Sequence, residues 1–292
     1  MNQSNDVTQA HNRKEPLMRR IIDFDYGLTI SEPQMIKPDI IYKQRYGIEI
    51  KVITLEETFA QLKEAGIAHA VIAANDVETI HGRKVPNERI ADLCRKYPDV
   101  FILGFAGSDP HKGMAAVREL ERAVKELGLK GCYVNPWYHQ IKANDRRYYL
   151  LYEKCAELDI PVSLHTASSL DYTISMDFGN PAHIDDVAVD IPELKIIMRH
   201  PCWPWVVQGI AVAYRQPNVY IDVSAMNPAM LPELVQAAKT ILQDKLLFGS
   251  AHPLIPPKRA VQWWEKLDLA EEIKDKIFYK NAARLIGLGQ ST

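Results

Sequence analysis

The sequence contains no long apolar run, no paired cysteines and no excess of charge of one sign. No stretch approaches the ~18 apolar residues of a membrane-spanning helix, and residues 1–20 have no apolar core like that of a signal peptide. The four cysteines, Cys94, Cys132, Cys155 and Cys202, form no CxxC pair, which argues against a zinc ribbon or a thioredoxin motif. We therefore expect a cytoplasmic protein whose thiols stay reduced and packed.

The charge balance and the length narrow the class of protein further. The 35 Lys and Arg residues nearly cancel the 37 Asp and Glu residues, for a net charge of −2. This balance gives no electrostatic reason to expect nucleic acid or an anionic membrane as a partner. A hydrophobic content of 47 % excludes a disordered chain, and 292 residues suit one (β/α)₈ barrel of ~250 residues.

Short apolar runs alternate with longer amphipathic runs along the chain. The expected strands are residues 20–24, 67–73, 100–105, 130–134, 160–164, 194–198, 219–223 and 245–248. The expected helices are residues 55–65, 87–96, 114–127, 147–158, 181–189, 205–214, 232–241, 258–266 and 271–286. Eight strand–helix repeats predict an α/β fold, a single (β/α)₈ TIM barrel over residues 19–292 with an extra C-terminal helix. Residues 1–18 are polar, and we expect a flexible lead-in there.

A doubly wound open sheet is the structural alternative, and the first strand argues against it. Such a sheet usually carries a glycine-rich turn there, but residues 23–27 read DFDYG and not G-x-G-x-x-G. Residues 25–52 contain no clear helix, so we expect a loop over the barrel mouth. Thr54 and Glu57 form a capping-box pattern that predicts the start of the next helix.

Functional side chains of such a barrel project from the carboxyl ends of the strands, where several polar residues fall. His165 and His200 end the fifth and sixth strands, Asp25 follows the first strand and His252 follows the eighth. Imidazole and carboxylate together suit a divalent metal, and without a metal the two strand-end histidines are suited to acid–base catalysis. His252 lies either on the rim or in solvent.

Other polar and aromatic residues near the strand ends have two interpretations each. Asp23 and Asp222 either belong to the site or hydrogen-bond the backbone at a strand end. Trp137 and Trp203 either line a pocket for an aromatic or apolar substrate or pack the loops.

Ordered motifs run through most of residues 20–288. They are residues 85–89 (VPNER), 97–99 (YPD), 161–165 (PVSLH), 192–200 (PELKIIMRH), 217–224 (PNVYIDVS), 248–250 (FGS) and 281–285 (NAARL). In these motifs the chain resembles the amidohydrolase-related (amidohydrolase 2) family of TIM-barrel metal-dependent hydrolases and decarboxylases, the group that includes aminocarboxymuconate semialdehyde decarboxylase.

The resemblance implies a metal site whose usual ligands are altered here. The family carries Asp-x-His-x-His on the first strand and an Asp after the eighth. Asp25 and Gly27 stand at the two histidine positions and Ala251 at the aspartate position, while His165 and His200 match the histidines of strands 5 and 6. A reduced set of Asp25, His165 and His200 for Zn, Mn or Fe is one reading, and a metal-free site is the other.

The resemblance also implies a reaction class and an assembly. It implies hydrolysis or nonoxidative decarboxylation of a small carboxylated or carbonyl substrate, with His200, His165 and Asp25 as catalytic residues. From their positions near the strand ends, we expect Trp137, Trp203 and His252 to contact the substrate. The altered ligands support a second hypothesis, a non-catalytic subunit that pairs with an active metal-binding paralogue. We expect a homodimer or a hetero-oligomer with such a paralogue. A small-molecule binding protein is a third hypothesis, with no feature of its own.

Overall fold

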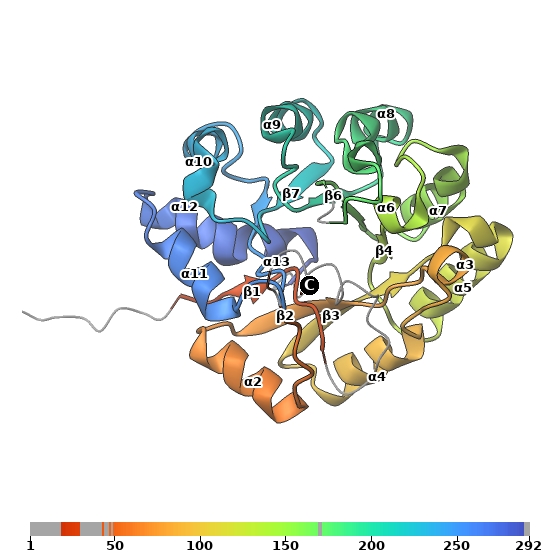
Figure 1. The fold of residues 1–292 in the computed structure, drawn as a ribbon, viewed down its shortest axis with the longest axis horizontal. Helices are drawn as coiled ribbons and strands as arrows, with labels where there is room; N and C mark the ends of the chain where they lie inside the picture. Colours follow the sequence, from red (N-terminus) through yellow and green to blue (C-terminus); the bar gives the residue numbers. More distant parts are fainter. Residues whose placement is uncertain (1–18, 30–42, 44–46, 48, 169–170, 289–292) are drawn as a thin grey trace, which may run out of the picture.

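Eight parallel strands follow one another in chain order around a single curled sheet, with helices on its outer side (Figure 1). The computed structural model describes residues 19–29, 43, 47, 49–168 and 171–288. The strands are β1 (Ile22–Asp23), β2 (His69–Ala73), β3 (Phe101–Gly107), β4 (Cys132–Val134), β5 (Val162–His165), β6 (Ile196–Arg199), β7 (Val219–Asp222) and β8 (Leu246–Leu247). Each strand pairs in parallel with the next, from β1–β2 to β7–β8.

The helices that connect the strands alternate with them as expected. The helices of five residues or more are α2 (Leu55–Glu64), α4 (Asn87–Lys96), α5 (Met114–Lys125), α7 (Arg146–Glu157), α8 (Ala182–Asp190), α9 (Val206–Arg215), α10 (Pro232–Lys239), α11 (Pro257–Glu265), α12 (Glu271–Asp275) and α13 (Asn281–Leu285). Short helical turns, which the sequence did not predict, follow five of the strands: α3 (Glu78–His81), η1 (Pro110–Lys112), α6 (Pro136–His139), η2 (Met176–Gly179) and η3 (Pro228–Met230).

The first and last strands meet and close the barrel. The amide of Phe24 donates to the carbonyl oxygen of Phe248 at 2.8 Å, and Tyr26 and His252 form a parallel bridge beyond the strands. The predicted TIM barrel is therefore confirmed.

Two apolar layers hold the barrel together. An inner cluster includes the inward side chains of Val71, Leu103 and Ile197, and α13 adds Ala282 and Leu285 to it. A larger outer cluster fills the space between the strands and the surrounding helices. Burial on both faces explains why the strands read as continuous apolar runs.

The start of α2 confirms the predicted capping box. Thr54 Oγ1 accepts from the amide of Glu57 at 3.1 Å, and the Glu57 side chain accepts from the amide of Thr54 at 2.7 Å. The two bonds satisfy amide groups that the helix itself leaves without partners.

Other predicted boundaries were wrong. Strands β1 and β8 have two residues each. Strand β1 ends early because the Asp23 carboxylate accepts from the amide of Asp25 at 3.2 Å and turns the chain away from the ladder. The single helix expected over residues 271–286 contains a π-helical turn, Lys276–Lys280, between α12 and α13.

Two segments expected from the sequence fall wholly or partly outside the described residues. Residues 1–18 and much of the expected loop over residues 25–52 lie outside the described residues. Within the described ranges, none of the helices has the length and apolar character needed to cross a membrane.

Candidate active site at the barrel mouth

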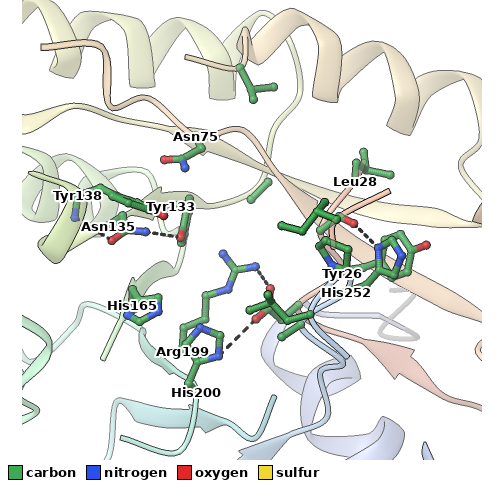
Figure 2. Close-up of a pocket in the computed structure, with 18 of the residues that line it drawn as sticks. Tyr26, Leu28, Asn75, Tyr133, Asn135, Tyr138, His165, Arg199, His200 and His252 are labelled. Atoms are coloured by element: carbon green, nitrogen blue, oxygen red, sulfur yellow. Dashed lines mark hydrogen bonds and ion pairs between the residues drawn. The ribbon is translucent and has the colours of Figure 1, made fainter. Parts of the chain in front are cut away.

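A cavity of about 230 Å³ opens at the carboxyl ends of the strands, where barrel sites are expected (Figure 2). Most of its described walls come from β2, β4, β5 and β6 and from the segments that follow β1, β2, β4, β6 and β8. Asp25 and Arg199 are the acidic and the basic residue among the described residues that line it, apart from three histidines, and aromatic rings supply much of the remaining wall. The cavity is thus a largely apolar pocket with a few converging polar groups, the usual form of a small-molecule site.

The central contact of the cavity is an ion pair between Arg199 and Asp25. Arg199 ends β6, and its Nη2 donates to Asp25 Oδ1. Their side chains are only 11 % and 8 % exposed. The guanidinium carbon also lies 4.4 Å from the ring centre of Tyr133, whose hydroxyl accepts from Asn135 at 3.1 Å. Burial opposes the charge on Arg199, but the Asp25 carboxylate together with Tyr133 and Asp222 outweighs burial and raises the pKa of Arg199.

Ser224 links the same carboxylate to His200. The Ser224 hydroxyl donates to Asp25 Oδ2 at 2.9 Å, and His200 Nδ1 lies 2.9 Å from Ser224 Oγ. Because the hydroxyl proton is used on Asp25, Ser224 Oγ accepts from His200 Nδ1–H, and this tautomer leaves a lone pair on Nε2. Burial lowers the pKa of His200 to about 4, with Arg199 contributing and Asp25 opposing, so the ring is neutral near pH 7.

A second histidine, His165, lies beside His200 and packs against the indole ring of Trp137. The ring centres of His165 and His200 are 4.4 Å apart, and Trp137 covers His165 at 4.3 Å. Trp137 Nε1 donates to the carbonyl of Ala167 at 3.0 Å, which fixes the indole. Burial, with smaller contributions from the neighbouring His200 and Arg199, lowers the pKa of His165 well below its usual value. The site therefore offers two neutral imidazoles next to one buried cation.

The two remaining predicted substrate residues differ in their placement. His252 lines the cavity, stacks on Tyr26 at 4.7 Å and donates from Nδ1 to the carbonyl of Gly27 at 2.7 Å. It thus lies on the rim and not in solvent. Trp203 is not among the described lining residues, and its side chain is 47 % exposed. Trp137, by contrast, belongs to the cavity wall.

Two buried carboxyl groups below the cavity bond the backbone. Asp23 Oδ1 accepts from the amide of Ser250 at 2.9 Å, and Asp222 Oδ1 accepts from the amide of Ser224 at 2.9 Å. Burial is the main cause that raises the pKa of Asp23 to about 6 and the pKa of Asp222 well above its usual value. These contacts match the strand-end alternative given for both residues.

The residues at the expected metal positions do not fit a divalent cation in this arrangement. Ligand atoms of Asp25, His200 and Asp222 lie within 4.8 Å of one another, so a candidate triad is present. However, Arg199 holds one oxygen of Asp25, and Ser224 bonds both Asp25 and His200. His165, the third member of the predicted ligand set, is not part of the triad and contacts the ring of His200 instead.

The positions of the other usual ligands are closed by the backbone. At Gly27 a Cβ atom would lie 2.2 Å from the carbonyl oxygen of His252, so no ligand side chain fits there without a shift of the chain. Ala251 has no ligand atom and is in the left-handed region at φ 57°. A metal at this site would have to displace contacts that the described residues already make.

From the sequence, Arg199, Ser224 and Asn135 were placed at strand ends but given no role in the site, and Tyr133 was missed. Arg199 and Ser224 both stand at predicted strand ends, so a signal was available. His200 has a φ of 69°, a left-handed conformation that is unusual outside glycine and is common at functional sites. That turn lets two consecutive residues face the cavity, where strand alternation alone sends them to opposite sides.

Histidines away from the cavity are engaged elsewhere. Four of them have a ring nitrogen 2.7–2.9 Å from a backbone carbonyl oxygen, namely His69, His81, His111 and His139. These contacts are typical of histidines with a structural role.

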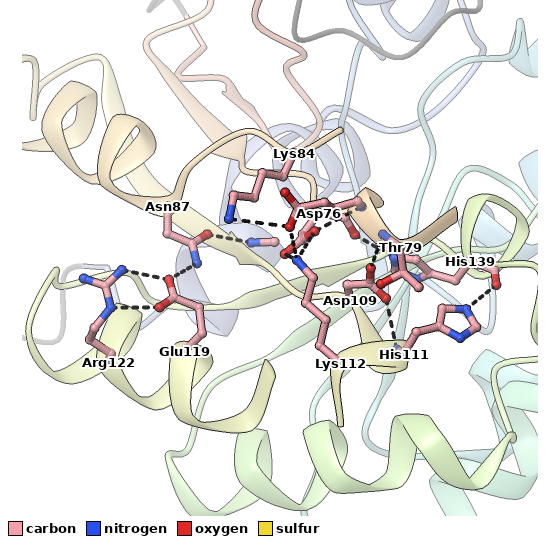
Figure 3. Close-up of polar contacts among 12 residues, drawn as sticks. Asp76, Thr79, Lys84, Asn87, Asp109, His111, Lys112, Glu119, Arg122 and His139 are labelled. Atoms are coloured by element: carbon pink, nitrogen blue, oxygen red, sulfur yellow. Dashed lines mark hydrogen bonds and ion pairs between the residues drawn. The ribbon is translucent and has the colours of Figure 1, made fainter. Parts of the chain in front are cut away.

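A second cavity, of about 330 Å³, lies beside η1 and α5 and is lined by charged side chains (Figure 3). Lys112 pairs with Asp76 at 2.6 Å, and Arg122 pairs with Glu119 at 2.8 Å. These charges neutralise one another, so this cavity makes a weaker case for a site than the barrel mouth.

The family model for amidohydrolase matches residues 32–288, most of the chain. The chain belongs to the amidohydrolase family. A 2-keto-4-carboxy-3-hexenedioate hydratase from Sphingobium is 26 % identical over 66 % of this chain and 69 % of its own length. A gamma-resorcylate decarboxylase from Rhizobium is 24 % identical over 82 % of this chain and 90 % of its own length. Membership and these named relatives support the expectation of an enzyme.

Solved structures give the same fold. An uncharacterized TIM-barrel protein from Bordetella bronchiseptica has a TM-score of 0.76 and 29 % identity, covering 92 % of this chain and 99 % of that chain. A dihydroxybenzoic acid decarboxylase from Polaromonas, solved with manganese and the inhibitor 2-nitroresorcinol, has a TM-score of 0.65 at 20 % identity over 94 % and 98 % of the two chains. At that identity the second likeness supports the barrel alone.

Proposed function

We propose that this amidohydrolase-family chain is a carboxy-lyase that removes the carboxyl group of a small planar carboxylated substrate without oxidation, at the barrel mouth. The observation that carries the proposal is the buried Arg199 guanidinium, which lies beside two neutral imidazoles in an aromatic-walled cavity. Arginine is the side chain best suited to hold a carboxylate or a neighbouring oxyanion. The gamma-resorcylate decarboxylases among the relatives support the same reaction class.

Nonoxidative decarboxylation consumes one proton and needs no oxidant or reductant. An anionic acid R–COO⁻ takes up one proton at the carbon that carries the carboxyl group, and the C–C bond breaks to give R–H and CO₂. His200 Nε2, which carries no proton in this tautomer, would first take one from water and then deliver it to that carbon, and the hydroxide left behind is taken up by CO₂ as bicarbonate; Ser224 holds Nδ1 throughout, and Asp25 orients the hydroxyl. Arg199 binds the anion and stabilises the negative charge that moves onto a neighbouring oxygen of the substrate. Trp137 and Tyr133 cover the planar part of the substrate.

Hydrolysis of a small carbonyl compound uses the same groups in another order. His200 Nε2 would take a proton from water as the water oxygen adds to the carbonyl carbon, and Arg199 would stabilise the oxyanion that forms. Collapse of this oxyanion would break the bond to the leaving group, which takes the proton from His200. The hydratase among the relatives also adds water to a carboxylated substrate, as its name states. Products distinguish the two reactions, because only decarboxylation releases CO₂.

Turnover of carboxylated phenols tests the proposal. The purified chain is incubated with 2,6-dihydroxybenzoate and 5-carboxyvanillate, the acids named for two structural neighbours, and CO₂ and the decarboxylated product are measured. His200→Gln should lower kcat by about 10²–10⁴, and Arg199→Met should lower kcat/KM by a factor of at least about 100. Arg215→Met is the matched control, since Arg215 is 60 % exposed on α9.

Two results would overturn the assignment. Full activity in His200→Gln or Arg199→Met would remove these residues from the chemistry. No turnover by the isolated chain, with turnover appearing only when a metal-binding paralogue co-purifies, would favour the accessory-subunit alternative instead. In that alternative a mixed oligomer would be seen by light scattering.

A further inference from the structure

We propose that Arg199 is a built-in cation that replaces a divalent metal at the barrel mouth, and that its removal uncovers a metal site at Asp25, His200 and Asp222. The inference rests on the proposed function only in treating this cavity as the active site. Its test measures metal binding without substrate, so the two proposals can fail separately.

The charges that line the cavity disfavour a bound divalent cation. Asp25 is the acidic residue and Arg199 the non-histidine basic residue among the described residues that line the cavity, and they contact each other directly. The pair leaves no net negative charge to attract a divalent cation. A cation bound at Asp25 would instead lie next to a guanidinium that cannot lose its proton.

Most of the atoms that could bind a metal already make hydrogen bonds. One oxygen of Asp25 accepts from Arg199 and the other accepts from Ser224, which lies 2.9 Å away. The same hydroxyl lies 2.9 Å from His200 Nδ1. Of the three candidate ligands, Asp222 has a free buried oxygen, Oδ2, without a hydrogen-bond partner. Metal binding would therefore have to break at least two existing interactions in the native arrangement.

Three side chains that could hold a metal still lie close together next to Arg199. Ligand atoms of Asp25, His200 and Asp222 lie within 4.8 Å of one another and are shielded from bulk solvent. Two carboxylates and one imidazole form a ligand set of acceptable chemistry for Zn²⁺ or Mn²⁺. Without the guanidinium, Asp25 Oδ1 loses its partner, Asp222 Oδ2 already has none, and the positive charge that repels a divalent ion is gone.

The test compares metal binding by variants of Arg199, with no substrate present. Wild type, Arg199→Met, Arg199→Lys and the exposed control Arg215→Met are treated with chelator, and Zn²⁺ or Mn²⁺ is then titrated by calorimetry, with bound metal counted by mass spectrometry after gel filtration. Wild type, Arg199→Lys and the control should retain less than about a tenth of an equivalent. Arg199→Met should retain close to one equivalent and bind at least about tenfold more tightly.

Two additional variants test where the gained metal binds and provide a substitute if Arg199→Met does not fold. Adding Asp25→Asn to Arg199→Met should abolish the gained binding, because a carboxylate ligand is removed. If Arg199→Met does not fold, Arg199→Gln replaces it, since glutamine is neutral and keeps a donor for Asp25.

Three outcomes would overturn the inference. One is stoichiometric metal in the wild type that Asp25→Asn removes, which would place a metal beside Arg199. Another is metal binding by the folded Met or Gln variant no tighter than by the wild type. The last is equal binding by Arg199→Lys and Arg199→Met, because the gain would then not depend on the lost positive charge.

Discussion

Removing one partner of the Asp25–Arg199 pair should destabilise the protein more than removing both. Arg199→Met leaves the Asp25 carboxylate, 8 % exposed, without its cation, and Asp25→Asn leaves the guanidinium, 11 % exposed, without its anion. A broken buried pair costs about 3–5 kcal/mol because one charge stays buried and uncompensated. At roughly 2 °C per kcal/mol for a large domain, each single variant should melt about 6–10 °C below the wild type.

The double variant tests whether the stabilising effects of Asp25 and Arg199 depend on each other. In Asp25→Asn/Arg199→Met neither charge remains, so its loss of stability should be far smaller than the sum of the two single losses. The coupling in the double-mutant cycle should exceed about 2 kcal/mol.

Urea unfolding followed by circular dichroism measures the cycle, and Arg215→Met supplies the control. Arg215 pairs with Asp185 on the surface, where its side chain is 60 % exposed, so its loss should cost about 0–1 kcal/mol. Additive single losses, or an Arg199→Met variant no less stable than the control, would refute the account of a buried and mutually dependent pair.

Three further predictions concern stability. Burial raises the pKa of Asp23 to about 6, so between about pH 4 and pH 6 the folded protein binds more protons than the unfolded chain, and its stability falls as pH rises through that window. Asp23→Asn should remove up to about 3 kcal/mol of this pH dependence in urea titrations, and an unchanged slope of stability against pH would contradict the prediction. Gly209→Ala should lower stability by about 1–3 kcal/mol in thermal unfolding, because its Cβ would lie 2.5 Å from Cys202 Sγ, and an unaltered melting temperature would show that the contact yields freely. Thr54→Ala should cost about 1 kcal/mol by removing the acceptor for the amide of Glu57, whereas Thr54→Ser should be nearly neutral in the same assay.

The barrel could be predicted because its cause is local and repeated. Each strand is buried on both faces and must be followed by a crossover helix, so apolar runs and amphipathic runs alternate eight times along the chain. The strand ends were predicted less well where a side chain stops the ladder. Asp23 bonds the amide of Asp25 and ends β1 early, and hydrophobicity carries no record of that bond.

The positions of the site residues followed from the barrel, but their contacts did not. His165 and Arg199 lie opposite each other in the β5–β6 register, so both reach the same end of the barrel once the topology is known. Periodicity also places Ser224 on the same side as Asp222, two residues earlier. The left-handed turn at His200, however, turns a second consecutive residue into the cavity, and no pattern in the sequence announces a φ of 69° at a histidine.

The charge pairing explains why counting lost metal ligands in the sequence gave an incomplete picture of the site. Asp25 and Arg199 are 174 positions apart, so their contact exists only after the barrel has closed. In the sequence, Asp25 appears as a poor substitute for a histidine ligand. In the folded chain it neutralises the guanidinium and, through Ser224, fixes which nitrogen of His200 carries the proton. One carboxylate thus positions both the guanidinium that would contact an anion and, through Ser224, the imidazole that would move the proton, so replacing Asp25 should disturb the position of both groups together.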